Sequence, residues 1–392
     1  MKPAPLEAAS LRLPDPDRLA ICTVGEIFGG VERHVLTIAQ GFAARDIQVT
    51  IFLFHDGELA AQARTDGIEI ALLSPHNISL LLTSWRFAHS LRERSIRLVH
   101  AHGYKATVLC ALARLWFSFS LVKTEHGLPE PISSGQLSTL RNRCYYLIEH
   151  IAARLARMVV CYVTDDLRTH YARQHRRLIT TVIANGVKTV DREHFSRPPD
   201  LPTCWFNLLM VGRLELIKGH HWAIRSIADA SIAPHIHLHI LGTGEEEEQL
   251  RRLSESLGLR DRVHFLGFRR NVYEYLAYCD VLLIPSIHEG LPYTLLEAMA
   301  LAVPTIASQV GGLAETLQDK STALLVPPQD KQALTQAIQL LYTNEALRLH
   351  ISIGVQQLQA AKYSVETMTE QYLMVYRRLL INAPDTAPLN IA

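Results

Sequence analysis

The feature that most constrains this chain is an alternation of short β-rich runs with segments of helical period, and the alternation occurs twice. Such alternation is typical of parallel sheets whose two faces are covered by helices. The first series predicts strands at residues 19–24, 49–54, 68–72, 98–100, 121–124 and 158–163. The second series predicts strands at residues 206–211, 236–241, 263–266, 281–284, 305–307 and 323–326. We therefore expect an α/β protein with two doubly wound parallel sheets.

A proline-rich stretch separates the two series and marks a domain boundary. The 392 residues exceed what one core of about 150 residues usually contains, and Pro198, Pro199 and Pro202 interrupt the periodic pattern. We expect the last helix to cross back onto the first domain. The pattern predicts an N-terminal extension at 1–18, a first domain at 19–198, a second domain at 203–363, the crossing helix at 364–381 and a flexible tail at 382–392.

Composition excludes several classes of protein. A hydrophobic content of 48% with 20% charged residues excludes an intrinsically disordered chain. The 39 basic and 38 acidic residues nearly cancel, so no nucleic-acid partner is expected. Six cysteines without a CxxC pair indicate a reducing compartment, and residues 1–18 lack the basic start and apolar core of a signal peptide. We therefore expect a cytoplasmic protein.

In open parallel sheets, ligands bind where the carboxyl ends of the strands meet the helix N-termini. In the first domain, Gly29 and Gly30 follow the first strand and open a helix, which offers backbone N–H groups to an anion. The spacing of these glycines is not GxGxxG, which argues against a dinucleotide cofactor. Taken alone, the loop is equally well explained as a structural glycine turn.

Two cations follow the first strand of the second domain. Arg213 offers a planar fork of donors and Lys218 a mobile point charge, a combination suited to a diphosphate. Either residue alone would be read as part of a solvated basic loop. Their shared position at a strand-to-helix edge favours phosphate binding.

Two glutamates frame the segment after the strand at 281–284. Glu289 lies in the loop, and Glu297 lies on the apolar face of the helix that follows. A buried carboxylate needs hydrogen-bond donors, and the hydroxyl groups of a ribose or hexose would supply them. The helix start near Tyr293 and Thr294 would present backbone N–H groups to a phosphate or sugar oxygen.

These residues resemble the donor-site signature of retaining glycosyltransferases of family 4. The signature is the pair Glu289 and Glu297 within Glu-Gly-Leu-Pro-Tyr-Thr-Leu-Leu-Glu, together with Gly212-Arg213 and Lys218-Gly219. Segments 29–34, 185–187 and 311–315 also resemble that family, so the similarity spans about residues 19–380. The resemblance implies a GT-B fold, in which two Rossmann-like domains face each other across a cleft.

The resemblance also implies substrates and residue roles. The donor would be a UDP- or GDP-sugar, and the acceptor a glycan or lipid-linked glycan used in cell-surface polysaccharide synthesis. Arg213 and Lys218 would neutralise the diphosphate, Glu289 would bind the sugar hydroxyls, and Glu297 would bind the ribose. Phe268 lies in the loop that would hold the base. The other residues expected to line the donor site are Gly29, Gly30, Gly290, Leu291, Tyr293 and Thr294.

Histidines follow two strands of the first domain and are candidates for the acceptor side. In the family's pattern, His126 would lie against the transferred sugar and the phosphate, whereas His102 and Lys105 would contact the acceptor or a phosphate. Strand-end histidines are also often satisfied by a backbone carbonyl, and this alternative stays open. For retention of configuration we favour a front-side reaction in which the leaving phosphate accepts the acceptor's proton, and a short-lived covalent intermediate is the alternative that the sequence leaves open.

No cofactor and no metal is expected. Asp15 and Asp17 form a DxD-like triplet, but they precede the first strand, away from any strand end. His235, His237 and His239 alternate along one strand, which we interpret as an edge strand with one wet side.

Membrane contact and two other functions are left open by the sequence. The basic stretches 141–157 and 168–177, with Trp85 and Trp116, suit a lipid-linked acceptor at a membrane surface, although solvated helix faces explain them equally well. A nucleotide-sugar epimerase of the same fold and a non-catalytic nucleotide-sugar-binding module are the alternative functions.

Overall fold

The computed structural model describes residues 18–26, 28–73, 79–127 and 136–381. Its first sheet has seven parallel strands in the order β3-β2-β1-β4-β5-β6-β7. The strands of this sheet are β1 Arg18–Thr23, β2 Gln48–Leu53, β3 Glu69–Leu72, β4 Leu98–His102, β5 Ser120–Glu125, β6 Val159–Tyr162 and β7 Ile179–Val182. The helices of this part are α1 Gly30–Ala43, α2 Glu58–Thr65, α3 Leu80–Glu93, α4 Tyr104–Ala113, α5 Gln136–Leu155 and α6 Asp165–Tyr171.

The second sheet has six parallel strands in the order β10-β9-β8-β11-β12-β13. These strands are β8 Phe206–Val211, β9 Ile236–Leu241, β10 Val263–Gly267, β11 Val281–Ile284, β12 Thr305–Ser308 and β13 Leu324–Val326. Its helices are α7 His220–Ile227, α8 Glu247–Ser256, α9 Val272–Tyr278, α10 Tyr293–Ala300, α11 Gly311–Thr316, α12 Lys331–Thr343 and α13 Glu345–Lys362. Short 3₁₀ turns occur at Arg192–His194 and Leu216–Lys218.

Successive residues of a strand point to opposite sides of its sheet, so the central strands contribute to an apolar core on each face. On β1, Leu19 and Ile21 belong to one apolar core, whereas Ala20 and Cys22 belong to the core on the other face. The second sheet divides its residues in the same way between two cores. The prediction of two doubly wound parallel sheets is confirmed.

The strand that the sequence analysis missed is β7. It carries the sequence Ile-Thr-Thr-Val, pairs with β6 alone, and is exposed or half-buried along its length. An edge strand of this kind lacks the continuous apolar run that marks the buried strands.

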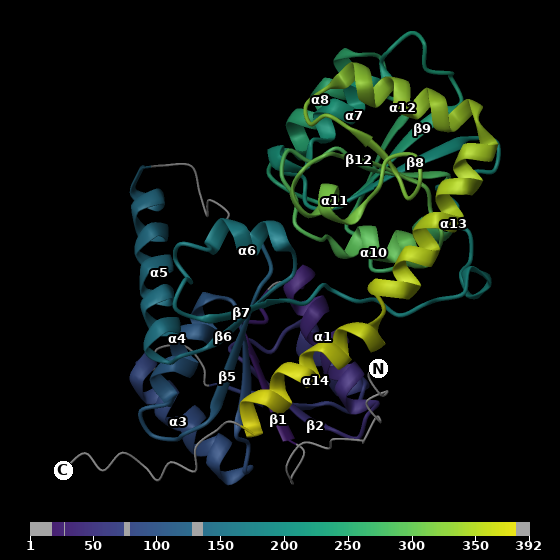
Figure 1. Cartoon of the computed structure of the whole chain (residues 1–392). Helices are drawn as coiled ribbons and strands as arrows, with labels where there is room; N and C mark the ends of the chain where they lie inside the picture. Colours follow the sequence, from purple (N-terminus) through teal and green to yellow (C-terminus); the bar gives the residue numbers. More distant parts are fainter. Residues whose placement is uncertain (1–17, 27, 74–78, 128–135, 382–392) are drawn as a thin grey trace, which may run out of the picture.

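The last helix, α14 (Val365–Ile381), crosses back onto the first domain, as expected (Figure 1). It packs against α1, and Tyr372 and Tyr376 are fully buried in the first domain's core. A Cβ atom on Gly41 of α1 would lie 2.3 Å from Thr369 Oγ1, so the close approach of the two helices requires glycine there.

The interpretation of the strand with alternating histidines was wrong. This strand, β9, lies between β8 and β10, and both His237 and His239 are buried. The ring of Trp205 stacks on His237 with the centroids 3.7 Å apart, and His239 Nε2 lies 3.0 Å from Asn207 Oδ1. The sequence pattern did not reveal that Trp205 covers this face.

Candidate active site

The centre of the candidate site is an ion pair between Lys218 and Glu289. Lys218 follows β8, and its Nζ donates to the two Glu289 carboxylate oxygens at 2.9 and 3.1 Å. Ser286 Oγ also donates to Glu289, at 3.0 Å. Gly219 has φ of +71°, and a Cβ there would lie 2.0 Å from the Pro285 carbonyl oxygen. This glycine therefore allows the Lys218 loop to press against the segment that carries Glu289.

The second predicted cation lies differently. The Arg213 side chain is more than half exposed, and its Nη1 forms an ion pair with Glu215 at 2.6 Å. The structure thus brings Lys218, but not Arg213, into direct contact with Glu289. Because Arg213 directly follows Gly212 at the end of β8, it stays at the same strand edge of the second domain.

Glu297 is almost completely buried on α10, with 2% of its side chain exposed. Its Oε1 lies 2.8 Å from Nη2 of Arg33, which belongs to the first turn of α1 in the other domain. Burial raises the pKa of Glu297 to about 7, and the Arg33 charge opposes this rise. The carboxylate predicted to bind a ribose is therefore held by a residue from the opposite domain.

The next residue of α1, His34, takes part in a second set of contacts between the domains. Asn185 donates from Nδ2 to the Leu291 carbonyl oxygen at 3.0 Å, so its Oδ1 faces His34 Nδ1, 2.9 Å away. His34 Nδ1 therefore carries the proton. The Tyr293 hydroxyl lies 3.4 Å from the same nitrogen.

The two predicted histidines of the first domain meet each other. His102, at the end of β4, places its Nδ1 2.9 Å from Nε2 of His126, which follows β5. The His34 ring lies edge-on to His126, with 4.7 Å between centroids. Burial lowers the pKa of His34 to about 4 and holds the pKa values of His102 and His126 well below the usual range. All three imidazoles are therefore neutral at neutral pH.

Among the described residues, His34, His102 and His126 form the one group whose arrangement could hold a metal ion, with ligand atoms within 4.8 Å of one another. Within this part of the chain, His34 Nε2 and His102 Nε2 are buried without a hydrogen-bond partner. The strand histidines that the sequence suggested do not form such a group. The Asp15 and Asp17 triplet lies outside the described residues.

The remaining predicted residues occupy the surroundings of these contacts. Gly29 precedes α1, and its N–H donates to Glu32 at 3.1 Å, while Gly30 is the first residue of the helix. Lys105 is exposed in the first turn of α4, and Phe268 is exposed after β10. Gly290 and Leu291 lead into α10, in which Tyr293 is buried and Thr294 is half-buried.

Contacts between the domains continue at α11. The Glu315 carboxylate accepts backbone N–H groups of Asp165 at 2.9 and 3.0 Å and of Asp166 at 3.1 Å. A Cβ atom on Gly312 would lie 2.3 Å from the Gly290 carbonyl oxygen and 2.7 Å from Thr164 Cγ2. The segment containing Gly312 and Glu315, which the sequence analysis marked only as a resemblance, thus forms part of the interface (Figure 1).

Arg33 and His34 are the site residues that sequence reasoning missed. Both lie in the segment 29–34 that carried part of the resemblance, yet only its glycines were assigned a role. A cation and an imidazole in the first turn after a glycine loop were the available signal. Their partners, Glu297 and Asn185, are more than 150 residues away in the chain, and only the fold brings them together.

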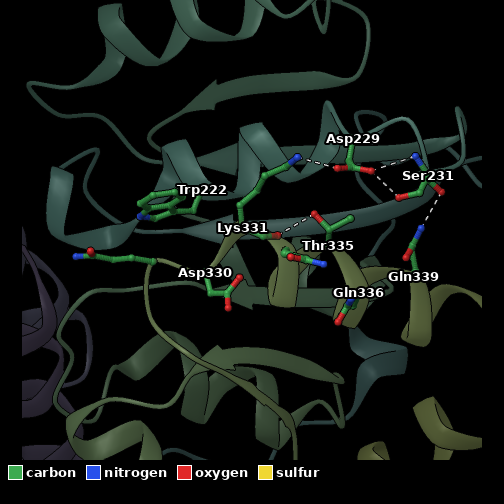
Figure 2. A pocket seen from close by; sticks show the side chains of 10 residues that line it. Trp222, Asp229, Ser231, Asp330, Lys331, Thr335, Gln336 and Gln339 are labelled. Carbon is green, nitrogen blue, oxygen red and sulfur yellow. Dashed lines mark hydrogen bonds and ion pairs between the residues drawn. The ribbon is translucent and has the colours of Figure 1, made fainter.

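A separate groove of about 760 Å³ lies between α7 and α12, and none of the predicted site residues lines it. Figure 2 shows Lys331 donating to Asp229, at 2.7 Å, with Ser231 bonded to the same carboxylate. Its lining is mostly amide, hydroxyl and carboxylate groups, with Trp222 at one end.

Among the described helices, none is long and apolar enough to cross a membrane.

Comparison with known proteins identifies the class. The family model described as Glycosyltransferase Family 4 matches residues 28–191, and the model described as Glycosyl transferases group 1 matches residues 191–357. The lipopolysaccharide core biosynthesis glycosyltransferase LpsD of Rhizobium meliloti is 30% identical over 357 residues, which cover 89% of this chain and 95% of LpsD. The O-antigen biosynthesis glycosyltransferase WbnH of Escherichia coli is 28% identical over 245 residues, or 60% of this chain and 65% of WbnH.

Solved structures agree on the fold. HepE of Anabaena, solved in complex with UDP, superposes with a TM-score of 0.76 at 24% identity and covers 91% of this chain and 98% of HepE. A glycosyltransferase of Rickettsia africae gives a TM-score of 0.77 at 18% identity, with coverage of 93% and 99%. The fold is therefore GT-B, as the resemblance implied. The chain belongs to the family 4 glycosyltransferases.

Proposed function

We propose that this glycosyltransferase moves a hexose from a UDP- or GDP-sugar to a glycan or lipid-linked glycan, with retention of anomeric configuration. The observation that carries the proposal is the Lys218–Glu289 ion pair at the strand edge of the second domain. This pair places a cation in direct contact with a carboxylate that can accept hydrogen bonds from sugar hydroxyl groups. The names of LpsD and WbnH support synthesis of a cell-surface polysaccharide as the setting.

The first step is recognition of the donor by the second domain. Lys218 would turn from Glu289 to the diphosphate, and Glu289 would then accept hydrogen bonds from the sugar hydroxyls. Arg213 lies at the same strand edge and would add its fork of donors to the phosphates. Cations placed before the reaction stabilise the negative charge that develops on the leaving oxygen. In this scheme Lys218 and Arg213 supply the charge that a metal ion provides elsewhere, so transfer would be metal-independent.

The chemical step would break the bond between the anomeric carbon and the diphosphate oxygen. The acceptor hydroxyl would form the new bond on the same face of the ring, and its proton would pass to the leaving phosphate oxygen. His126 and His102 are neutral and hydrogen-bonded to each other, which suits them to contact sugar hydroxyls rather than to balance charge. This front-side route explains retention without a carboxylate nucleophile.

The donor is tested by screening UDP- and GDP-sugars for a rise in thermal midpoint, because a ligand that binds the folded state stabilises it. The preferred donor is then incubated with and without an oligosaccharide acceptor, and the products are followed by NMR. We expect transfer with retained configuration. An inverted linkage would contradict the retaining assignment. Altered sugar in the absence of acceptor would favour the epimerase, and binding without any reaction would favour the non-catalytic module.

We further propose that the first domain contacts a membrane surface, where a lipid-linked acceptor would lie. Helix α4 packs against both α3 and α5, and large apolar side chains are exposed on α3, on α5 and in the turn after α4. On α5, Ile148, Ile151 and Leu155 share one helix face at spacings of three and four, and Arg154 is exposed beside them. Apolar residues mixed with arginines suit an anionic membrane surface. The exposed apolar residues of α3 and of the turn after α4 are Leu80, Leu81, Leu82, Trp85, Leu115 and Trp116.

This contact is tested by co-sedimentation with vesicles of phosphatidylcholine containing about a third phosphatidylglycerol. We expect the wild-type protein to sediment with the vesicles and the Ile151→Glu variant to remain in solution. The matched control is Ile353→Glu, which changes an apolar residue of similar exposure on α13 of the second domain. Equal sedimentation of both variants and the wild type would contradict the proposed surface.

A further inference from the structure

The contact between Arg33 and Glu297 joins a donor-site residue of one domain to a cation of the other. Glu297 lies on α10 of the second domain, and Arg33 lies on α1 of the first. Their side chains approach to 2.8 Å, while the Arg33 side chain remains about one third exposed and Glu297 is buried. The Arg33 guanidinium also lies 5.8 Å from the ring centroid of Tyr273 on α9.

A carboxylate this deeply buried is costly to ionise unless a positive charge accompanies it. Within the described residues, the groups that interact electrostatically with Glu297 are Arg33 from α1, Tyr273 from α9 and Tyr293 from α10 itself. Of these, Arg33 alone is a cation. Burial raises the pKa of Glu297 to about 7, and without Arg33 it would be higher still.

We propose that Arg33 is a positioning residue of the donor site, reaching from the first domain to keep Glu297 ionised as the hydrogen-bond acceptor for the nucleoside ribose. The inference rests on the proposed function, because it takes Glu297 as the ribose ligand. An ionised carboxylate accepts hydrogen bonds that are about twice as strong as those of a neutral acceptor. Donor binding would therefore depend on the first domain, although that domain is assigned to the acceptor.

The experiment measures the affinity of UDP and of GDP by calorimetry from about pH 6.5 to pH 8.5, on the full chain. The wild type should bind one of them, more weakly as the pH falls through about 7. Arg33→Met should move this midpoint upward by about one pH unit, which lowers affinity about fivefold at pH 7 and leaves it near wild type at pH 8.5. Arg33→Lys should restore the wild-type midpoint. Protonation of the nucleotide's own phosphate changes the affinity equally for all variants, so it does not affect the difference between their midpoints.

Two further variants separate this role from a structural one. Glu58→Gln breaks another ion pair between the domains, the 2.8 Å contact of Glu58 with Arg270, and should leave the midpoint unchanged. Glu297→Gln should bind weakly at every pH. If Arg33→Met weakens binding equally at all pH values, or if Glu297→Gln keeps the wild-type midpoint, the proposal is overturned. Failure of the wild type to bind either nucleotide would instead overturn the proposed function, and this inference with it.

Discussion

The carboxyl edges of the two sheets have the same architecture but present different side chains to the space between the domains. In the second domain the edge is charged, with Lys218 paired to Glu289 and Arg213 paired to Glu215. In the first domain, His102 and His126 lie at the edge as imidazoles that burial keeps neutral, beside the buried ion pairs of Lys123 with Glu125 and Glu149. Under the proposed function, the edge of the second domain would bind an anion and the edge of the first domain would bind hydroxyl groups.

Under the proposed function, this difference would divide the work of transfer between the two domains. A diphosphate leaving group needs fixed positive charge, which the charged edge would supply. The hydroxyl groups of an acceptor sugar could donate hydrogen bonds to neutral imidazoles or accept hydrogen bonds from them. Arg33 and Glu297 connect the two edges, so the division is not complete.

The largest expected effect is the loss of charge at the second domain's edge. Lys218→Ala removes the cation proposed to meet the diphosphate, and loss of one preorganised contact of this kind costs about 10²–10³ in rate. We expect kcat to fall by that factor, while circular dichroism shows an intact fold. Steady-state transfer from the preferred nucleotide sugar is the measurement.

The matched control for Lys218→Ala is Lys331→Ala. Lys331 also forms an ion pair with a carboxylate, 2.7 Å from Asp229, but this pair lies in the groove between α7 and α12 (Figure 2). We expect near-normal transfer by this variant. Equal losses in the two variants would mean that any broken ion pair impairs the domain, and near-normal transfer by Lys218→Ala would remove the charged edge from the mechanism.

The charged edge could be predicted from the sequence, and the neutral edge only in part. Glu289 and Glu297 belong to one pattern of strand, loop and helix after β11, and Lys218 belongs to a separate pattern of the same kind after β8. In each pattern the position just after the strand predicts a place at the strand edge. The sequence also placed His102 and His126 after their strands. It did not reveal that they bond to each other, because that contact depends on the relative height at which β4 and β5 end.

Residues whose partners lie far away in the chain were the hardest to predict. Arg33 lies 264 positions before Glu297, and His34 lies 151 positions before Asn185, so no local pattern links the members of either pair. The prediction that β9 is an edge strand failed for a similar reason. The side chain that covers its histidines, Trp205, comes from the segment before β8. Local periodicity gives the strands, but partners distant in the chain decide which polar side chains are buried.

A smaller effect is expected on the stability of the protein at acidic pH, and it tests whether the imidazoles of the first domain's edge are neutral. Histidine has a pKa near 6.5 in the unfolded chain, whereas burial lowers the pKa of His34 to about 4 in the folded protein. Between these values the unfolded chain binds the proton and the folded chain does not, so stability falls as the pH drops. At pH 5 this one residue would cost about 2 kcal/mol of stability.

His34→Gln should therefore lose less stability than the wild type between pH 7 and pH 5, as measured by urea denaturation at the two values. Glutamine retains an amide N–H for Asn185 but does not titrate. The control is His350→Gln, at an exposed histidine of α13, which should keep the wild-type dependence. An unchanged dependence in His34→Gln would show that this histidine is not the neutral, buried group described above.

The smallest expected effect is that of a chelator, and it tests both edges together. At the charged edge, Lys218 and Arg213 would already neutralise the diphosphate, so we expect no loss of turnover in excess EDTA. At the neutral edge, an ion held by His34, His102 and His126 would have to replace the 2.9 Å hydrogen bond between His102 and His126. Inhibition by EDTA that Mn²⁺ or Mg²⁺ reverses would overturn the metal-independent mechanism. Activation by EDTA would instead reveal a metal ion that the three histidines hold and that competes with the acceptor. Removing this ion would restore the hydrogen bond between His102 and His126 and would free the imidazoles to contact hydroxyl groups.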